Sequence, residues 1–284
     1  MPKIEHILFP YDFSHQCTLV APYVRAVACR FGTKLTLLGV VPTVWDTRSA
    51  DMPILTGAAA PEVELKMHLD KAAGAVFAGL PVETATALGD AAFKIEQIAR
   101  IKHVDLIMMP THGFGTFRTL LIGSVTAKVL HDSKCPVWTA AHSVEQSSPD
   151  VPRKILCAVD RTAETVKVMK WAAEYSQKMG ATLKLLHVVT PVSDILSLPG
   201  ERQLQEEVRK EAANQIQASL QKAGVEIPFT VAVGSIMETV TEEARREQAD
   251  LIIIGRGSLP NTLGALHTHA YGIIQQSPCP VLSV

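Results

Sequence analysis

A chain of 284 residues is long enough to form two domains of ordinary size. Hydrophobic residues make up 47% of the sequence and charged residues 19%, so each half can build an apolar core and wholesale disorder is excluded. The formal net charge is −1 and aromatic residues make up 5%, which argues against a basic nucleic-acid-binding module and against stacking platforms for single strands.

The cysteines and the chain termini indicate the compartment. The five cysteines are odd in number and include no Cys-x-x-Cys pair, which is typical of reduced and mostly buried thiols. The N-terminus leads straight into an apolar run and lacks the apolar core of a signal peptide. Polar residues and prolines interrupt the uncharged stretch 257–284 too often for a membrane span. We therefore expect a cytoplasmic protein that does not associate with membranes.

Short apolar runs alternate with segments of helical periodicity along the first half. Ile7–Pro10 has the length of a strand that is buried on both faces of a parallel sheet. Apolar residues spaced by three and four over 20–31 predict a helix that Asp12 or Ser14 caps and Gly32 ends. The remaining predicted elements are strands at 35–41, 82–88, 105–109 and 137–140, helices at 62–78, 91–102 and 124–130, and a long loop at 45–60.

The second half repeats this order of motifs. After a polar linker at 142–152 that is rich in Pro and Ser, Ile155–Asp160 mirrors Ile7–Asp12. Because the repetition continues to the end of the chain, we infer a duplication with domain 1 at 1–141 and domain 2 at 153–284, each a parallel α/β sheet. The other mirrored segments are Leu185–Val189 with Leu37–Val41, Ala249–Ile253 with Val104–Met108, and Cys279–Val281 with Cys135–Val137.

The segment after the strand at 105–109 has the features of an anion site. Nine residues separate Gly113 from Gly123, and Ser124 opens the next helical segment. Such a loop directs backbone N–H groups and the positive end of a helix dipole at one place. In an open α/β sheet, ligands bind beyond the carboxyl ends of the strands where the winding reverses. We therefore predict a nucleotide phosphate here, although ordinary turn and N-cap chemistry explains these residues equally well from spacing alone.

An Ile-Leu-Phe-Pro-x-Asp-Phe-Ser opening with a second copy, a Leu-Leu-x-Val-Val second strand and Gly-x9-Gly-Ser together resemble a tandem universal stress protein. The resemblance covers nearly the whole chain. It implies two doubly wound five-stranded parallel sheets of strand order 3-2-1-4-5, similar to adenine nucleotide α-hydrolases and paired about a pseudo-twofold axis. The ATP-binding branch of this family carries Gly-x2-Gly-x9-Gly followed by Ser or Thr. Here Pro110 replaces the first glycine, which removes one backbone donor.

The resemblance also implies roles for individual positions. Its ligand would be ATP, with or without Mg2+, and it assigns no catalytic or metal-binding residue. The adenine pocket would come from Pro10, Asp12 and Val40. Met109 and Pro110 would contact the ribose. The phosphates would be held by Gly113, Gly123, Ser124 and Val125. In the second half, His267–Thr268 stand where Gly123–Ser124 stand in the first. A side chain at 267 would crowd a phosphate, so we expect a degenerate site that binds weakly or not at all.

Several polar residues have two interpretations. Asp12 either caps the following helix or reads the adenine amino group. His112 and Arg118 either contact phosphate or lie in solvent. His267 and His269 point apart on a helix and have no third ligand, so we predict no metal site there.

No catalytic constellation stands out, because the chain lacks a GxxxxGK[ST] lysine and paired carboxylates with an assigned metal. Our leading hypothesis is a cytoplasmic stress protein that binds ATP as a regulatory ligand, with at most slow hydrolysis, and is read by a protein partner. The chain would be an intrachain pseudo-dimer able to form a homodimer. The alternatives are an adenine-nucleotide hydrolase or transferase and a nucleotide-free interaction scaffold.

Overall fold

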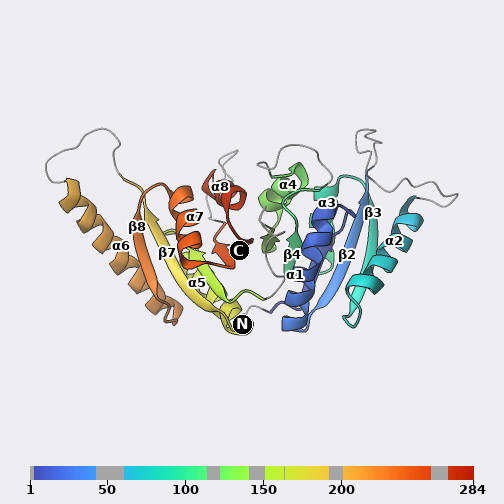
Figure 1. Ribbon diagram of the computed structural model, residues 1–284, viewed down its shortest axis with the longest axis horizontal. Coiled ribbons are helices and arrows are strands. Elements are labelled where there is room, and N and C mark those ends of the chain that lie inside the picture. Colours follow the sequence, from blue (N-terminus) through green and yellow to red (C-terminus); the bar gives the residue numbers. More distant parts are fainter. Residues whose placement is uncertain are drawn as a thin grey trace. The chain divides into compact units, whose positions relative to one another are not determined.

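The computed structural model describes residues 3–42, 61–113, 122–140, 151–162, 164–191, 201–256 and 268–284 (Figure 1). The predicted loop at 45–60, most of the linker, Arg118 and His267 therefore lie outside the described residues. The chain separates into two compact units, Lys3–Val151 and Pro152–Val284. None of the helices within the described ranges is long and apolar enough to cross a membrane.

The first unit contains a five-stranded parallel sheet of order β3-β2-β1-β4-β5. Its central strands are apolar on both faces, as Ile7 of β1 and Ile107 of β4 show by being fully buried. The predicted strand order 3-2-1-4-5 is thus confirmed. The strands are β1 (His6–Pro10), β2 (Lys34–Val41), β3 (Val82–Leu88), β4 (Leu106–Met109) and β5 (Val137–Thr139).

Four helices connect these strands and cover the sheet (Figure 1). Helix α2 contacts α1 as well as β2 and β3, whereas α3 contacts α4. Right-handed crossovers explain this pairing, because the chain winds from β1 to β3 in one direction and then returns to β4 on the other side of β1. The helices are α1 (His15–Phe31), α2 (Pro61–Val76), α3 (Ala91–Ile101) and α4 (Ser124–Asp132).

The ends of α1 follow from local chemistry. The Ser14 hydroxyl accepts a hydrogen bond from the Cys17 backbone N–H at 3.2 Å and begins the helix. Gly32 ends it in the left-handed region, with φ of 67°, where glycine has no steric penalty. Helix α4 begins differently, because its N-cap is Gly123, which has no capping side chain, and Ser124 is the first helical residue. The predicted alternative of a serine N-cap is therefore wrong at this helix.

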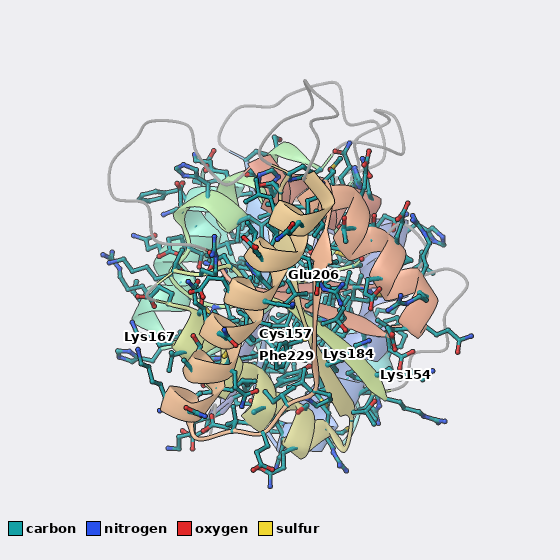
Figure 2. The ribbon with its side chains drawn as sticks, turned by 90° about the vertical axis from the view of Figure 1, so that its left-hand side faces the viewer. Lys154, Cys157, Lys167, Lys184, Glu206 and Phe229 are labelled. Carbon is teal, nitrogen blue, oxygen red and sulfur yellow. The ribbon has the colours of Figure 1, made fainter. Side chains whose placement is uncertain are left out.

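The second unit repeats the first, with a parallel sheet of order β8-β7-β6-β9-β10. Figure 2 faces this unit, with α6, which carries Glu206, in front of the strands that carry Cys157 and Phe229. Its strands are β6 (Lys154–Ala158), β7 (Thr182–Val189), β8 (Phe229–Val233), β9 (Leu251–Ile254) and β10 (Val281–Ser283). Its helices are α5 (Thr165–Met179), α6 (Glu201–Ala223), α7 (Ile236–Glu247) and α8 (Thr268–Gln276).

One side-chain connection between strands appears in both units. The Asp105 carboxylate accepts backbone N–H groups from Glu5 at 2.8 Å and His6 at 3.0 Å, which ties the entry of β4 to β1. Asp250 accepts the equivalent pair from Arg153 and Lys154, both at 2.9 Å. The repeated aspartates in the sequence therefore mark one structural device used twice. Pairing of the halves about a pseudo-twofold axis stays a prediction.

Candidate functional site

The predicted site residues of the first unit lie where three neighbouring strands end. β1 lies between β2 and β4, and its residue Pro10 pairs with Leu38 of β2. Asp12 lies two residues after Pro10, and Val40 lies two residues after Leu38, so both reach the same edge of the sheet. The winding reverses between β1 and β4, which is the position at which α/β sheets bind ligands.

Asp12 borders the loop that follows β4. One carboxylate oxygen, Oδ1, accepts the backbone N–H of Ser14 at 2.9 Å, in the manner of a residue that shapes the entry to a helix. The other oxygen, Oδ2, lies against Gly113, where any Cβ would collide with it. A side chain at position 113 would therefore need the Asp12 carboxylate to shift. The structure gives Asp12 its structural role and also places its second oxygen at the candidate site.

Gly123 returns to the start of the loop that follows β4. The Gly123 N–H donates to the Thr111 carbonyl at 2.8 Å, and a Cβ on Gly123 would lie 3.3 Å from that oxygen and 3.5 Å from the His112 Cα. The predicted approach of Gly113 and Gly123 is consistent with this closure. However, the Gly123 amide is engaged in closing the loop, so it does not serve as a donor to a phosphate.

The N-terminus of α4 lies directly beside this closure. The first intrahelical bond of α4 runs from the Ala127 N–H to the Gly123 carbonyl at 2.8 Å, so the amides of Ser124 and Val125 precede the helical ladder. Both side chains are exposed. These two amides, together with the helix dipole, are the part of the candidate site whose chemistry suits an anion.

Thr126 is a site residue that the sequence analysis missed. Its buried hydroxyl donates to the Pro110 carbonyl at 3.0 Å and fixes the start of the loop to the first turn of α4. Pro110 lacks an N–H, but its carbonyl oxygen still accepts this hydrogen bond, so the proline takes part in holding the loop. The bond joins residues sixteen positions apart, and the only signal in the sequence is a threonine in the first turn after the loop.

The other predicted residues differ in accessibility. Met109 is buried in the core, with 4% of its surface exposed, and its carbonyl accepts the Ala140 N–H at 3.3 Å. A ribose contact by its side chain therefore finds no support in the structure. Val40 is half-buried at the sheet edge, and His112 Nδ1 lies 3.1 Å from the Thr111 hydroxyl.

A thiol lies beneath the site. Cys17 is buried and its Sγ–H donates to the Pro10 carbonyl at 3.7 Å. Burial raises the pKa of Cys17 well above its ordinary value, so the thiol stays protonated and does not act as a nucleophile. In the part of the chain that the structure describes, no group of three or more His, Cys, Asp and Glu side chains could hold a metal ion.

Comparison with known proteins decides the family. The family model described as Universal stress protein family matches residues 3–140 and again residues 152–284. The chain belongs to this family. The double match confirms the predicted tandem repeat of the universal stress fold.

Individual universal stress proteins share parts of the chain. One from Synechocystis sp. is 35% identical over 136 residues, which cover 46% of this chain and 82% of that protein. Another, from Mycolicibacterium smegmatis, is 24% identical over 188 residues, or 64% of this chain and 62% of that protein. The crystal structure of a universal stress protein from Archaeoglobus fulgidus has a TM-score of 0.65 at 21% identity, covering 99% of this chain and 96% of that one.

The second universal stress unit keeps the aspartate turn of the first at the equivalent strand end and adds a threonine contact to it. The Asp160 carboxylate, which corresponds to Asp12, accepts the Thr162 N–H at 3.1 Å and the Thr165 hydroxyl at 2.9 Å. Asp160 therefore stabilises the entry to α5. Residues 257–267, which include the predicted replacement of glycine by His267, lie outside the described residues.

Proposed function

We propose that the first half of this universal stress protein binds ATP, with or without Mg2+, at the β1/β4 edge as a regulatory ligand. The observation that carries the proposal is the closed loop. The bond from the Gly123 N–H to the Thr111 carbonyl brings the N-terminus of α4 beside the exits of β1 and β4. Backbone donors at a helix N-terminus suit a phosphate and need no cationic side chain.

The proposed pose keeps the family assignments and adjusts two of them. Gly123 sets how closely a phosphate approaches the loop, since its own amide is engaged. Because the Met109 side chain is buried, Met109 would support the ribose from below through its backbone position and not through a side-chain contact. The proposed adenine contacts are Pro10, Asp12 and Val40, the ribose lies over Met109 and Pro110, and the phosphates lie at Gly113, Ser124 and Val125.

Slow turnover follows from the composition of the site. None of the nine proposed residues is a lysine, an arginine or a histidine. Backbone amides hold phosphate charge in the bound nucleotide, but they do not add the further charge stabilisation that speeds phosphoryl transfer. ATP therefore acts by favouring one conformation or assembly state that a partner recognises.

The organisation of the whole chain belongs to the same proposal. Domain 1 spans 1–141, domain 2 spans 153–284, and residues 142–152 join them. The halves pair as an intrachain pseudo-dimer, and two such chains can associate further. We place the protein in the cytoplasm, where ATP is available and an interacting protein reads its nucleotide state.

Equilibrium dialysis with labelled ATP tests the proposal. Gly113→Val drives a side chain into Asp12 and is expected to weaken ATP binding at least tenfold, a change of about 1.4 kcal/mol. Gly74→Val is the matched control, because a Cβ at Gly74 of α2 meets no atom within 4 Å. Equal affinity of the Gly113→Val and wild-type proteins contradicts the assignment.

Two further readouts separate the alternatives. Hydrolysis at about one turnover per second or faster, within the ordinary enzymatic range, would favour the hydrolase or transferase. No ATP binding by the wild-type protein, together with no shift in its melting temperature, would favour the nucleotide-free scaffold.

A further inference from the structure

The second unit contains a cavity of about 270 Å3 at the carboxyl ends of β6, β7 and β9, roofed by α7 and α8. Its walls are predominantly aliphatic, and they include Leu186, Val188, Val240, Ile254 and Ile273. This volume lies just below the range of about 300–1,000 Å3 that holds drug-sized molecules. One or two fused rings would therefore fill it.

Strand alternation explains why the sheet side of this cavity is apolar. The Lys184 ammonium, labelled in Figure 2, contacts Glu247 at 2.8 Å and Glu243 at 3.3 Å, both on α7. Leu186 and Val188 share its face of β7 because side chains alternate along a strand. His187 points to the opposite face, where its Nδ1–H donates to the Val159 carbonyl at 2.9 Å. Burial lowers the pKa of His187, so the imidazole stays neutral and adds no charge near the cavity.

The described part of the cavity wall offers an anion no fixed cation, and the charges near it are mixed, because Arg161 beside Asp160 also acts on His187. No lysine or arginine is among the lining residues of the described chain. The exposed lining residues are Asp160, a carboxylate, and His269. Glu238 adds a negative charge in the first turn of α7. The first-turn amides of α7, whose N-cap serine makes no side-chain cap hydrogen bond, remain available to a neutral oxygen acceptor such as a carbonyl or a hydroxyl.

We propose that this cavity is a second ligand site, specific for a small, neutral, largely apolar ring compound that carries one carbonyl or hydroxyl oxygen. The rings would pack against the aliphatic walls while the oxygen accepts a hydrogen bond from a helix N-terminus. The two halves then bind ligands of different chemistry. This site does not depend on ATP binding by the first half.

Fluorescence titration of the full chain with Prodan, a neutral naphthalene ketone, tests this inference. Wild-type protein is expected to give a saturable, blue-shifted emission, because the probe leaves water for an apolar site. Ala270→Trp and Ile236→Trp place an indole into the cavity from two helices and are each expected to weaken binding at least tenfold. Ala218→Trp is the matched control, since Ala218 is exposed on α6, away from the cavity.

Other arms address folding, charge and the nucleotide. Circular dichroism reports whether each variant folds, and Ile236→Trp decides the result if Ala270→Trp does not fold, because Ile236 is half-buried at the first position of α7. Saturating ATP is expected to leave Prodan bound. The anion 6-anilinonaphthalene-2-sulfonate is expected to bind more weakly than Prodan.

Four results would overturn the inference. The first is no saturable Prodan binding by the wild-type protein, and the second is unchanged Prodan affinity in a folded cavity variant. The third is displacement of Prodan by ATP. The fourth is binding of the sulfonate that is tighter than Prodan binding and is lost in both cavity variants. Displacement by ATP would identify a nucleotide site in place of the neutral one.

Discussion

Substitution of Gly123 tests how the proposed nucleotide loop works. Gly123 has φ of −60° and ψ of 147°, a conformation that any residue adopts, so the backbone itself opposes no side chain. The obstacle is steric, because a Cβ would lie 3.3 Å from the carbonyl oxygen of Thr111, the group that accepts the Gly123 amide. A backbone atom held by that bond yields only by moving the loop, and such overpacking costs about 1–3 kcal/mol.

Three variants separate steric crowding from helix capping. A tenfold loss of affinity corresponds to roughly 1.4 kcal/mol, which is within the expected strain. If the ATP-bound state carries that strain, Gly123→Ala is expected to weaken ATP binding about tenfold. Gly123→Val is expected to weaken it more. Gly123→Ser adds the same Cβ but supplies a preferred N-cap, so it is expected to retain stability while losing affinity. Isothermal titration calorimetry gives the affinities, and scanning calorimetry gives the melting temperatures.

The contrary results are also distinct. Wild-type affinity in Gly123→Val refutes the proposed phosphate loop. An equal loss of ATP binding in Gly74→Val, whose added side chain has open space, shows that the loss reflects a general effect on the fold. Full affinity in Gly123→Ser with reduced affinity in Gly123→Ala assigns the effect to capping and contradicts the steric account.

Two further predictions concern an ion pair and a buried hydroxyl of the first unit. Hydrogen bonds from Lys102 and Lys34 lower the pKa of Glu83 from 4.5 to about 2, so the stabilisation is complete above pH 4.5 and is lost as pH falls towards 2. Because Glu83 is partly exposed, Glu83→Gln is expected to lower the free energy of unfolding by about 1 kcal/mol at pH 7 and by progressively less as pH falls through 2, measured by urea denaturation; a gap that does not shrink between pH 4.5 and pH 2 would contradict the pairing. Thr126→Val removes the donor to Pro110 and is expected to cost about 1 kcal/mol and to weaken ATP binding. Thr126→Ser keeps the hydroxyl, so equal losses in both variants would disprove a role for the hydrogen bond.

The fold could be predicted because its determinants are local or periodic. Ile7–Pro10 is apolar at every position, which is typical of a strand covered on both faces, and β1 occupies His6–Pro10. Ser14 and Gly32 carry the chemistry of helix ends and act as such in α1. Because the sequence is duplicated, each element could be predicted from two copies, and Asp105 and Asp250 have matching roles in the two units.

The site was less predictable because its contacts join distant segments. The sequence places Gly113 and Gly123 in one loop, but it does not show that the Gly123 amide bonds to Thr111. Nor does it show that the second oxygen of Asp12 lies against Gly113, which depends on how β1 and β4 pack. Thr126 was missed for the same reason, since its partner is sixteen residues away.

Native mass spectrometry of the intact chain titrated with ATP tests the central claim most directly. We predict that one nucleotide binds per chain, that Gly123→Val abolishes the bound species, and that Gly74→Val retains it. A chain that stays free of nucleotide at millimolar ATP, or one that takes up two nucleotides with similar affinity, would contradict a functional phosphate loop in the first half beside a diverged second half.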